Sequence, residues 1–190
     1  MKHILEPMLS YLRMLKVKRY LKKYSNPTVL DIGCGERCLF LNQIKNIIDK
    51  GYGIDGRITS KSYQNITLFN GNIEYGIPMH NDEIDVITML AVLEHLNNPL
   101  IVLSEIERVL KPGGTLIITV PSVWSKPVLE FLSFKIGVID PELLIEHKTY
   151  YNKNSLSKLL LNVEGLYIER HRYFQFFMNN LVIVKKQLTH

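Results

Sequence analysis

This 190-residue sequence lacks the features of a membrane-spanning, exported or disulfide-rich protein. No apolar run approaches the ~20 residues that a transmembrane helix needs. Near the N-terminus, Glu6, Pro7 and Arg13 interrupt any apolar centre of a signal peptide. The two cysteines, Cys34 and Cys38, have no second Cys/His pair at ligand spacing that would complete a zinc site. The sequence therefore predicts a cytoplasmic protein with two small buried thiols and no disulfide.

Internal repeats, low-complexity tracts and domain linkers are absent as well. Hydrophobic residues make up 46% of the chain and charged residues 22%, which is ordinary for a globular protein. A chain of this length can bury a sizeable core as one unit. We therefore expect residues 1–190 to form a single domain.

Positive charge is concentrated near the N-terminus. Residues 1–25 contain seven Lys and Arg residues and one acid, a net charge of +6, whereas the whole chain carries +5. The remaining residues therefore carry −1. Because the basic character belongs to one segment, the composition does not indicate a protein that coats nucleic acid with its whole surface.

The basic N-terminal segment (residues 1–25) is expected to be helical. Apolar residues recur at spacings of three and four, which predicts an amphipathic helix over residues 3–24 with its lysines on the other face. The residues of the apolar face are Ile4, Leu5, Met8, Leu9, Leu12, Leu15 and Tyr20. The helix could bind an anionic membrane, RNA or an acidic substrate. We favour a helix that packs on the core and keeps a basic face in solvent, because such helices are common in globular domains.

From residue 28 the sequence alternates between strand and helix patterns. Strands are predicted at residues 28–32, 52–54, 65–69, 84–90, 115–120, 166–173 and 181–185. Helices are predicted at residues 39–48, 100–110 and 154–161, the last capped by Asn154 or Ser155. Strands separated by helices form parallel units covered on both faces. We expect an α/β fold with one doubly wound, Rossmann-like sheet, mostly parallel and seven-stranded, with an antiparallel last strand.

The alternation stops after Pro121. Residues 122–145 are apolar and aromatic and show no clean strand or helix pattern, so residues 122–150 form a probable insert on the substrate side. Trp124, Phe131 and Phe134 could offer an apolar or stacking surface to a substrate as part of a lid. Ordinary core packing of a helical insertion explains the same composition, and the sequence leaves both interpretations open.

A glycine turn follows the first predicted strand, in the stretch from Thr28 to Arg37. Gly33 and Gly35 would let the backbone pass close to a ligand, because glycine has no Cβ. The third glycine of a dinucleotide-binding turn is missing, since position 38 is Cys, and no phosphate-loop Gly-Lys-Ser/Thr is present.

The acids around this turn indicate the charge of its ligand. Asp31 and Glu36 would serve a pyrophosphate poorly and would better suit a ligand with an amine and positive character. Asp55, at the end of the second predicted strand, is placed to accept hydrogen bonds from ribose hydroxyls.

Several motifs in order resemble those of the class I S-adenosylmethionine-dependent methyltransferases, close to the small-molecule branch called the methyltransferase-11 type. The matching stretches are Val29-Leu30-Asp31-Ile32-Gly33-Cys34-Gly35, Gly53-Ile54-Asp55, Gly71-Asn72-Ile73-Glu74, Val92-Leu93-Glu94-His95, Val109-Leu110-Lys111-Pro112-Gly113-Gly114, Glu146-His147-Lys148 and Tyr150-Tyr151. The resemblance covers roughly residues 28–185. It implies S-adenosylmethionine as the cofactor.

The resemblance also implies where the cofactor would lie. Its methionine end would lie against Asp31, Gly33, Cys34 and Gly35, its ribose against Asp55 and Gly56, its adenine beside Asn72 and Ile73, and its flank near Leu90. Two positions depart from the family pattern. Arg37 stands where the family often has a third glycine, and Asn72 where it often has Asp. Arg37 could face solvent or fold over a carboxylate, and Asn72 can still hydrogen-bond adenine.

Methyl transfer from a sulfonium is an in-line displacement, so a general base is needed only if the acceptor arrives protonated. His95 and His147 are the candidate bases, and a purely structural histidine is the alternative at each position. Trp124, Tyr150 and Tyr151 are candidate acceptor contacts, with packing as the alternative.

The leading hypothesis is methyl transfer to a small-molecule or lipid-linked acceptor. An RNA methyltransferase that uses the basic helix is an alternative, although residues 89–92 lack the Asn/Asp-Pro-Pro-Tyr tetrapeptide that would hold a base amino group. A non-catalytic partner protein with this fold is another. Nucleic acid is the less favoured partner, and peripheral membrane contact stays open. The oligomeric state does not follow from the sequence.

Overall fold

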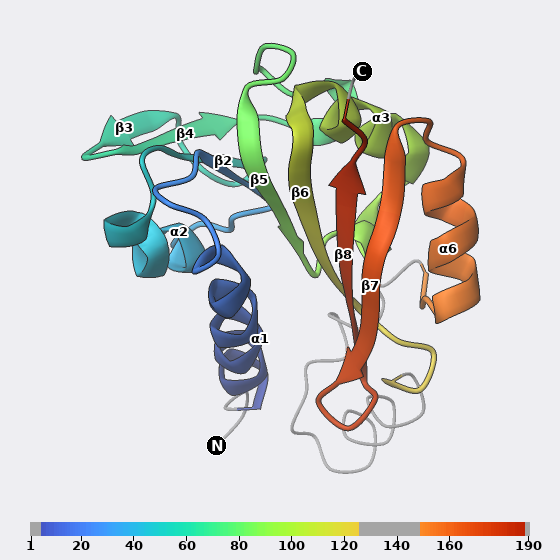
Figure 1. Ribbon diagram of the computed structural model, residues 1–190. Helices are drawn as coiled ribbons and strands as arrows, with labels where there is room; N and C mark the ends of the chain where they lie inside the picture. Colours follow the sequence, from blue (N-terminus) through green and yellow to red (C-terminus); the bar gives the residue numbers. More distant parts are fainter. Residues whose placement is uncertain (1–4, 126–148, 189–190) are drawn as a thin grey trace.

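A twisted sheet of eight strands forms the centre of the molecule (Figure 1). The computed structural model describes residues 5–125 and 149–188. The strands lie in the order β3-β4-β2-β1-β5-β6-β8-β7. Their bounds are β1 Val29–Ile32, β2 Gly51–Asp55, β3 Lys61–Tyr63, β4 Ile66–Asn70, β5 Ile84–Leu90, β6 Leu110–Pro121, β7 Leu166–Phe174 and β8 Asn179–Lys186.

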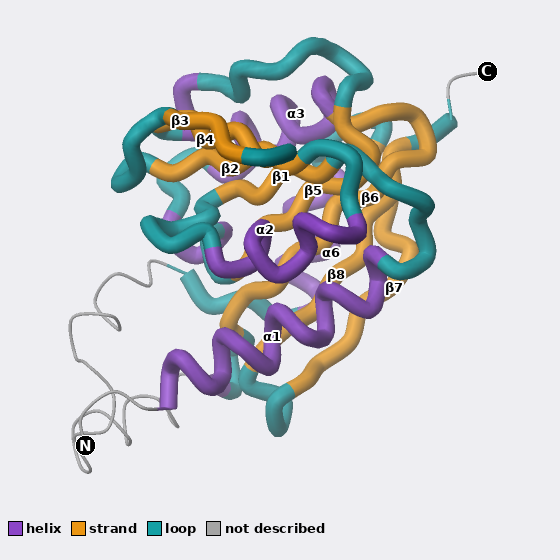
Figure 2. The backbone as a smooth tube through the Cα atoms, turned by 90° about the vertical axis from the view of Figure 1, so that its left-hand side faces the viewer, coloured by secondary structure: helices purple, strands orange, loops and turns teal. Residues whose placement is uncertain are grey.

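Helices cover both faces of this sheet. They are α1 Leu5–Leu21, α2 Leu39–Ile44, α3 Pro99–Val109 and α6 Lys153–Leu161, with the short 3-10 helices η1 Lys45–Ile47, η2 Ile73–Tyr75 and η3 Leu93–His95. Helices α1 and α2 lie together over one face (Figure 2), where Val17 and Leu41 join one buried cluster. On the other face Ile106 of α3 and Leu156 of α6 join the second cluster. The predicted doubly wound arrangement is confirmed.

The strand directions also follow the prediction. Strands β4, β2, β1, β5 and β6 are parallel, and β8 is antiparallel to both of its neighbours, β6 and β7. The predicted number of seven strands is wrong, because Lys61–Tyr63 forms an eighth, antiparallel strand at the edge beside β4. Two of its three residues are exposed, so the sequence there has no apolar alternation to predict a strand.

The N-terminal helix is confirmed, but its buried face is not the predicted one. Met14, Val17 and Leu21 are buried, whereas Met8 and Leu15 of the predicted apolar face are exposed. The reason is that α1 has apolar residues on two sides, so spacing alone does not decide which side packs on the sheet. The outer side is apolar toward the N-terminus and basic toward the C-terminus.

Two helix boundaries differ from the prediction. Helix α2 ends at Ile44, and the chain continues into the 3-10 turn η1 instead of reaching residue 48. Helix α6 is capped by Asn152, not by Asn154 or Ser155. The Ser155 backbone N–H donates to Asn152 Oδ1 at 2.9 Å, and the Asn152 N–H donates to Ser155 Oγ at 2.9 Å, a reciprocal capping box.

Among the described residues, no helix combines the length and apolarity needed to cross a membrane.

Candidate functional site

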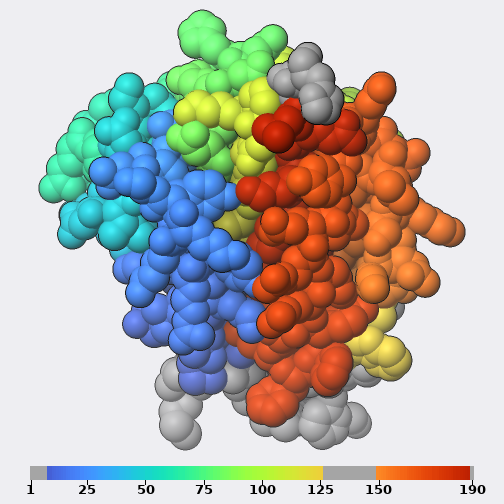
Figure 3. Space-filling model, in the orientation of Figure 1, coloured from blue at the N-terminus to red at the C-terminus, as the bar shows by residue number. Residues whose placement is uncertain are grey.

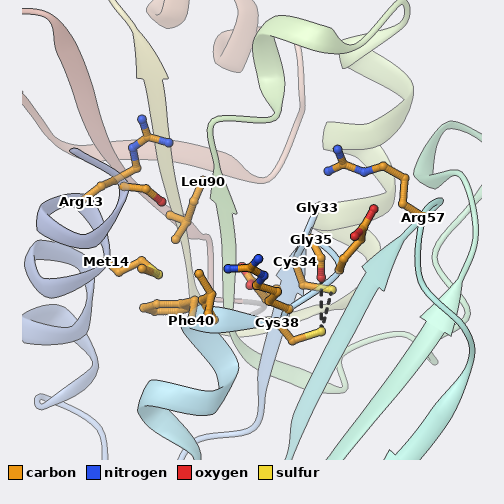
Figure 4. A pocket seen from close by; sticks show the side chains of 14 residues that line it. Arg13, Met14, Gly33, Cys34, Gly35, Cys38, Phe40, Arg57 and Leu90 are labelled. Atoms are coloured by element: carbon orange, nitrogen blue, oxygen red, sulfur yellow. Dashed lines mark hydrogen bonds between the residues drawn. The ribbon is translucent and has the colours of Figure 1, made fainter. Parts of the chain in front are cut away.

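A cavity of about 450 Å³ lies at the carboxyl ends of β1 and β5. The glycine turn after β1 forms one wall, and Ser10, Arg13 and Met14 of α1 form the opposite one. Figure 4 shows Arg13 and Met14 across the cavity from Gly35 and Arg57. Ligands of open α/β sheets bind at this edge, and the volume falls in the range of small-molecule sites. The cavity is therefore the candidate binding site.

The two glycines of the turn have different reasons to be glycine. Both have left-handed backbones, with φ of 68° at Gly33 and 69° at Gly35, a region that side chains disfavour. A Cβ at Gly33 would lie 2.3 Å from Val92 Cγ2, whereas a Cβ at Gly35 would meet no atom within 4 Å. Gly33 thus lets the turn pack against Val92, two residues beyond the end of β5, and Gly35 keeps the backbone open toward the cavity.

Asp31 is a buried acid among the charged residues that line the cavity, the others being Glu36, Arg13, Arg37 and Arg57. Its side chain is buried, and Thr88 Oγ1 donates to its Oδ1 at 2.6 Å. Burial raises the pKa of Asp31 to about 7; the Thr88 hydrogen bond lowers it and the nearby charge of Asp55 raises it further. A cation in the cavity would stabilise the ionised carboxylate. The part of the cavity beside Asp31 therefore suits a positively charged group of a ligand, and the sequence-based expectation of such a ligand stays a prediction.

Both carboxylate oxygens of Asp55 accept hydrogen bonds from the protein. Its Oδ2 accepts from Gly35 N at 2.9 Å, and its Oδ1 accepts from Arg57 N at 2.9 Å and from Arg57 Nε at 3.3 Å. Burial alone would raise the pKa of Asp55, but these hydrogen bonds outweigh it, so the pKa lies below its ordinary value. Asp55 is thus an ionised acceptor that fastens β2 to the glycine turn.

Cys34 and Cys38 are free, buried thiols, as predicted. Their sulfurs are 3.8 Å apart, and Cys38 Sγ donates to the Gly35 carbonyl at 3.3 Å. Burial raises the pKa of both thiols, so they are poor nucleophiles. In the described part of the chain, no group of His, Cys, Asp and Glu side chains could hold a metal ion.

Arg37, the departure from the family's third glycine, lines the cavity together with Asp31 and Leu90. Asp55, Gly56, Asn72 and Ile73 lie outside this lining. Asn72 Oδ1 accepts from Glu74 N at 2.9 Å and so caps η2, Ile73 packs in the core, and Gly56 is exposed at the end of β2. Their predicted contacts with ribose and adenine stay predictions.

Residues 6–170 match the sequence model of a family described as a methyltransferase domain. The chain belongs to this methyltransferase family. Solved structures agree on the fold. One chain from the structure of a complex between the Haloferax volcanii Trm112 methyltransferase activator and a methyltransferase is 17% identical to this chain. Its TM-score is 0.72, and the match covers 90% of this chain and 88% of that chain.

Two S-adenosylmethionine-dependent methyltransferases have the same fold as this methyltransferase. The Aquifex aeolicus protein is 21% identical with a TM-score of 0.66, covering 91% of this chain and 89% of its own. The Mesorhizobium loti protein is 14% identical, also with a TM-score of 0.66, covering 88% and 96% of the two chains. A comparison with curated proteins gave no match.

Beyond the cofactor cavity, this methyltransferase has a buried acid that the sequence analysis did not single out. Glu94, in η3 after β5, is 0% exposed, and neither carboxylate oxygen has a hydrogen-bond partner among the described residues. Burial raises the pKa of Glu94 to about 7, although the positive charge of Arg13 lowers it. Buried carboxylates that accept no hydrogen bond are rare, and acids with a raised pKa gather at functional sites. Glu94 belongs to one of the motifs that resemble the family, but only its burial in the structure marks it as a candidate functional residue.

The predicted base His95 and the predicted acceptor contact Tyr151 both interact with Glu94. His95 Nε2 is 4.0 Å from Glu94 Oε1, and its side chain is 36% exposed. Tyr151 is buried, and its pKa is raised by burial and by the charge of Glu94. Tyr150 is half-buried, whereas Trp124 is 63% exposed and does not line the cavity. The predicted base His147 lies outside the described residues.

Proposed function

We propose that this methyltransferase transfers a methyl group to a small-molecule or lipid-linked acceptor that approaches from the side of Glu94. Its cofactor is S-adenosylmethionine. The observation that supports this proposal is the cavity at the end of β1, where the buried Asp31 carboxyl faces an open glycine turn. An acid of this kind suits a cofactor that has both an ammonium and a sulfonium group.

The residues of the cavity, together with Asp55 next to Gly35, fit this cofactor. Asp31 and the Gly33–Gly35 turn would hold the methionine end, because the turn leaves its backbone accessible and Asp31 supplies negative charge. Asp55 would take the ribose hydroxyls in place of one of its bonds to Arg57. Arg37 would serve the cofactor carboxylate. When bound, the cofactor supplies a methyl group on a positively charged sulfur.

The protein's own contribution is chiefly alignment. Holding the acceptor in line with the methyl group can supply on the order of 7–11 kcal/mol. The walls for such alignment are Leu90 at the end of β5 and the α1 residues Arg13 and Met14. An acceptor placed between these walls would lie beside the end of β5, on the side where η3 follows.

Glu94 is 0% exposed and is not part of the cavity lining, so it would accept the proton that an O–H or N–H acceptor loses only when the bound acceptor reaches it. The bound cofactor would supply the methyl group to the acceptor atom and would keep the electron pair of its carbon–sulfur bond, and the Glu94 carboxylate would take the acceptor's proton. A carboxyl with a pKa near the working pH is suited to this role. The half-exposed His95, 4.0 Å away, then offers a route for the proton to solvent.

The experiment is incubation of the protein with methyl-labelled S-adenosylmethionine and extract of the source cell, separated into lipid, small-molecule and RNA fractions. We expect label in the lipid or small-molecule fraction. Label confined to RNA would overturn the choice of acceptor in favour of the RNA alternative. If calorimetric titration detected no saturable binding of S-adenosylmethionine, the cofactor assignment would fail, and a non-catalytic partner protein would be the better interpretation.

A further inference from the structure

Among the described residues, large exposed apolar side chains gather at one end of the molecule. We call the set formed by Met8, Tyr11, Leu12, Trp124, Phe176 and Phe177 the apolar end. Phe176 is 95% exposed and Phe177 64%. Single exposed apolar residues are normal, but a group contributed by three separate elements marks an interaction surface.

Hydrogen bonds hold the three elements of the apolar end together. Gln175 Nε2, at the turn of the β7–β8 hairpin, donates to the Leu9 carbonyl of α1 at 2.8 Å. On the other side, Ser122 Oγ donates to the Phe177 carbonyl, and Trp124 N donates to Ser122 Oγ at 3.2 Å. The hairpin turn therefore lies between α1 and the segment after β6, at the bottom of Figure 1.

The backbone of the hairpin turn is strained in a way that exposes its aromatic rings. Gln175, Phe176 and Phe177 all have positive φ values, of 50°, 54° and 65°. This region is uncommon for residues other than glycine and is a true outlier for bulky ones. Strain of this kind persists where function requires it. A turn selected only for stability would have Gly or Asn here.

Basic residues lie next to the apolar end. Residues 8–25 contain six Lys and Arg residues and no acid. On the outer side of α1, the exposed Leu15 is followed by the exposed Arg19 and Lys22 one and two turns further along. Figure 3 shows this helix (blue) directly beside β7 and β8. Along α1, an apolar tip is thus followed by basic residues. This order matches the layers of an anionic membrane, because the tip would meet the hydrocarbon and the basic residues would meet the lipid phosphates.

We propose that the apolar end docks on the surface of an anionic lipid bilayer, with its side chains in the acyl boundary and Arg19 and Lys22 at the headgroups. Aromatic and apolar residues on short projecting turns enter such a boundary without requiring a spanning segment. Charge complementarity selects a bilayer over a second copy of the chain, because two copies would bring their basic helices together.

This docking would place the cavity at the membrane. Ser10 and Arg13 line the cavity, while Met8 and Leu12 on the same turns of α1 belong to the apolar end. The segment with Trp124 follows β6 at the carboxyl edge of the sheet. This point rests on the proposed function: a lipid-linked acceptor could then enter from the bilayer without crossing water.

The test is co-sedimentation of the full chain with phosphatidylcholine vesicles, with and without phosphatidylglycerol. The sharpest variant is Phe176→Asn with Phe177→Asn, because asparagine is polar and tolerates left-handed backbone. This variant should unfold at the same or a higher denaturant concentration than the wild type, yet its vesicle affinity should fall about tenfold or more. Arg19→Gln with Lys22→Gln should remove the preference for anionic vesicles.

The matched control is Leu161→Asn, an exposed leucine at the far end of α6, which should leave vesicle binding unchanged. Wild-type protein that ignores anionic vesicles, or an asparagine tip variant that binds as well as wild type, would overturn the proposal. So would wild-type dimers that the tip variant dissociates. Titration with S-adenosylmethionine, run on the same samples, reports separately on the proposed function.

Discussion

The two halves of the site differ in how their residues come together. The proposed cofactor half consists of Asp31, the glycine turn and Asp55, all within one stretch of about 25 residues that forms β1, the turn and β2. The proposed acceptor half combines Arg13, Glu94 and Tyr151, which come from α1, from η3 and from the segment before α6. Local motifs therefore suffice to predict the first half, whereas the second depends on long-range packing.

The chemistry of the two halves differs as well. In the cofactor half, Asp31 and Asp55 have hydrogen-bond partners that fix their geometry before any ligand binds. In the acceptor half, the Glu94 oxygens have none among the described residues. A preorganised half suits a cofactor that is the same whichever acceptor is methylated, and a half with unsatisfied polar atoms suits a substrate that supplies the missing hydrogen bonds. The following predictions test that contrast, from the largest expected effect to the smallest.

Asp31→Asn should produce the largest effect. We expect binding of S-adenosylmethionine, measured by calorimetric titration, to weaken at least 100-fold, because about 3 kcal/mol of charge interaction is lost. The free protein should become more stable at neutral pH. A neutral amide at this position cannot ionise in the core, and it can still accept from Thr88.

The pH dependence of stability provides the control for Asp31. Its folded pKa of about 7 lies above its unfolded value of 3.8, so the folded state binds more protons between these values. Stability is therefore fully present below about pH 4 and falls as pH rises toward 7, by up to roughly 4 kcal/mol for this group. Urea unfolding at pH 5 and pH 8 should show a smaller difference in Asp31→Asn. An equal difference would contradict the assignment.

Glu94→Gln should separate chemistry from cofactor binding. With an acceptor that must lose a proton, kcat should fall by about 10²–10⁴-fold, while the affinity for S-adenosylmethionine stays within a factor of about two. The wild-type rate should rise with pH through about 7, as the carboxyl ionises, and this limb of the pH–rate profile should vanish in the variant. A parallel loss of cofactor affinity would instead make Glu94 part of the cofactor half.

Replacing Gly33 by alanine should mainly lower stability, whereas replacing Gly35 by alanine should mainly weaken cofactor binding. Gly33→Ala should cost about 2–4 kcal/mol of unfolding free energy, because strain at positive φ adds to the 2.3 Å approach to Val92. Gly35→Ala should cost only about 1 kcal/mol from strain, yet weaken cofactor binding as its Cβ enters the cavity. Denaturant unfolding and calorimetry on both variants measure the pair, and equal losses of stability would contradict the contrast.

His95→Gln should have the smallest effect on the rate. If Glu94 takes the proton and His95 only passes it on to solvent, kcat should fall less than about tenfold, because solvent can reach this half-exposed position directly. A loss as large as that of Glu94→Gln would restore His95 as the base. The measurement is the same pH–rate profile.

Prediction from sequence worked where residues close in the chain decide the structure. The strand from Ile84 to Leu90 was predicted to the residue, because its apolar run is long and clearly bounded. Of the cavity lining, Asp31, the glycine turn and Leu90 were predicted as well. Their places follow from a strand, a turn and the common edge of a parallel sheet.

The prediction of the buried side of α1 failed, because apolar residues on two sides of this helix allowed either side to pack on the sheet. The outer and inner sides of α1 both have apolar residues, and the inner side packs because Met14, Val17 and Leu21 meet the same cluster as Phe174 and Ile183. These partners are more than 150 residues away in the chain, so no spacing within the helix could indicate them.

The sequence by itself determined the family, the doubly wound sheet and the cofactor turn, because each depends on periodicity or on backbone chemistry within a few residues. Only the tertiary structure decided that Glu94 is buried with no hydrogen bond to its carboxylate from the described residues, and that Phe176, Trp124 and Met8 share one end of the molecule. Burial and proximity arise when distant segments pack together, and a one-dimensional pattern contains neither.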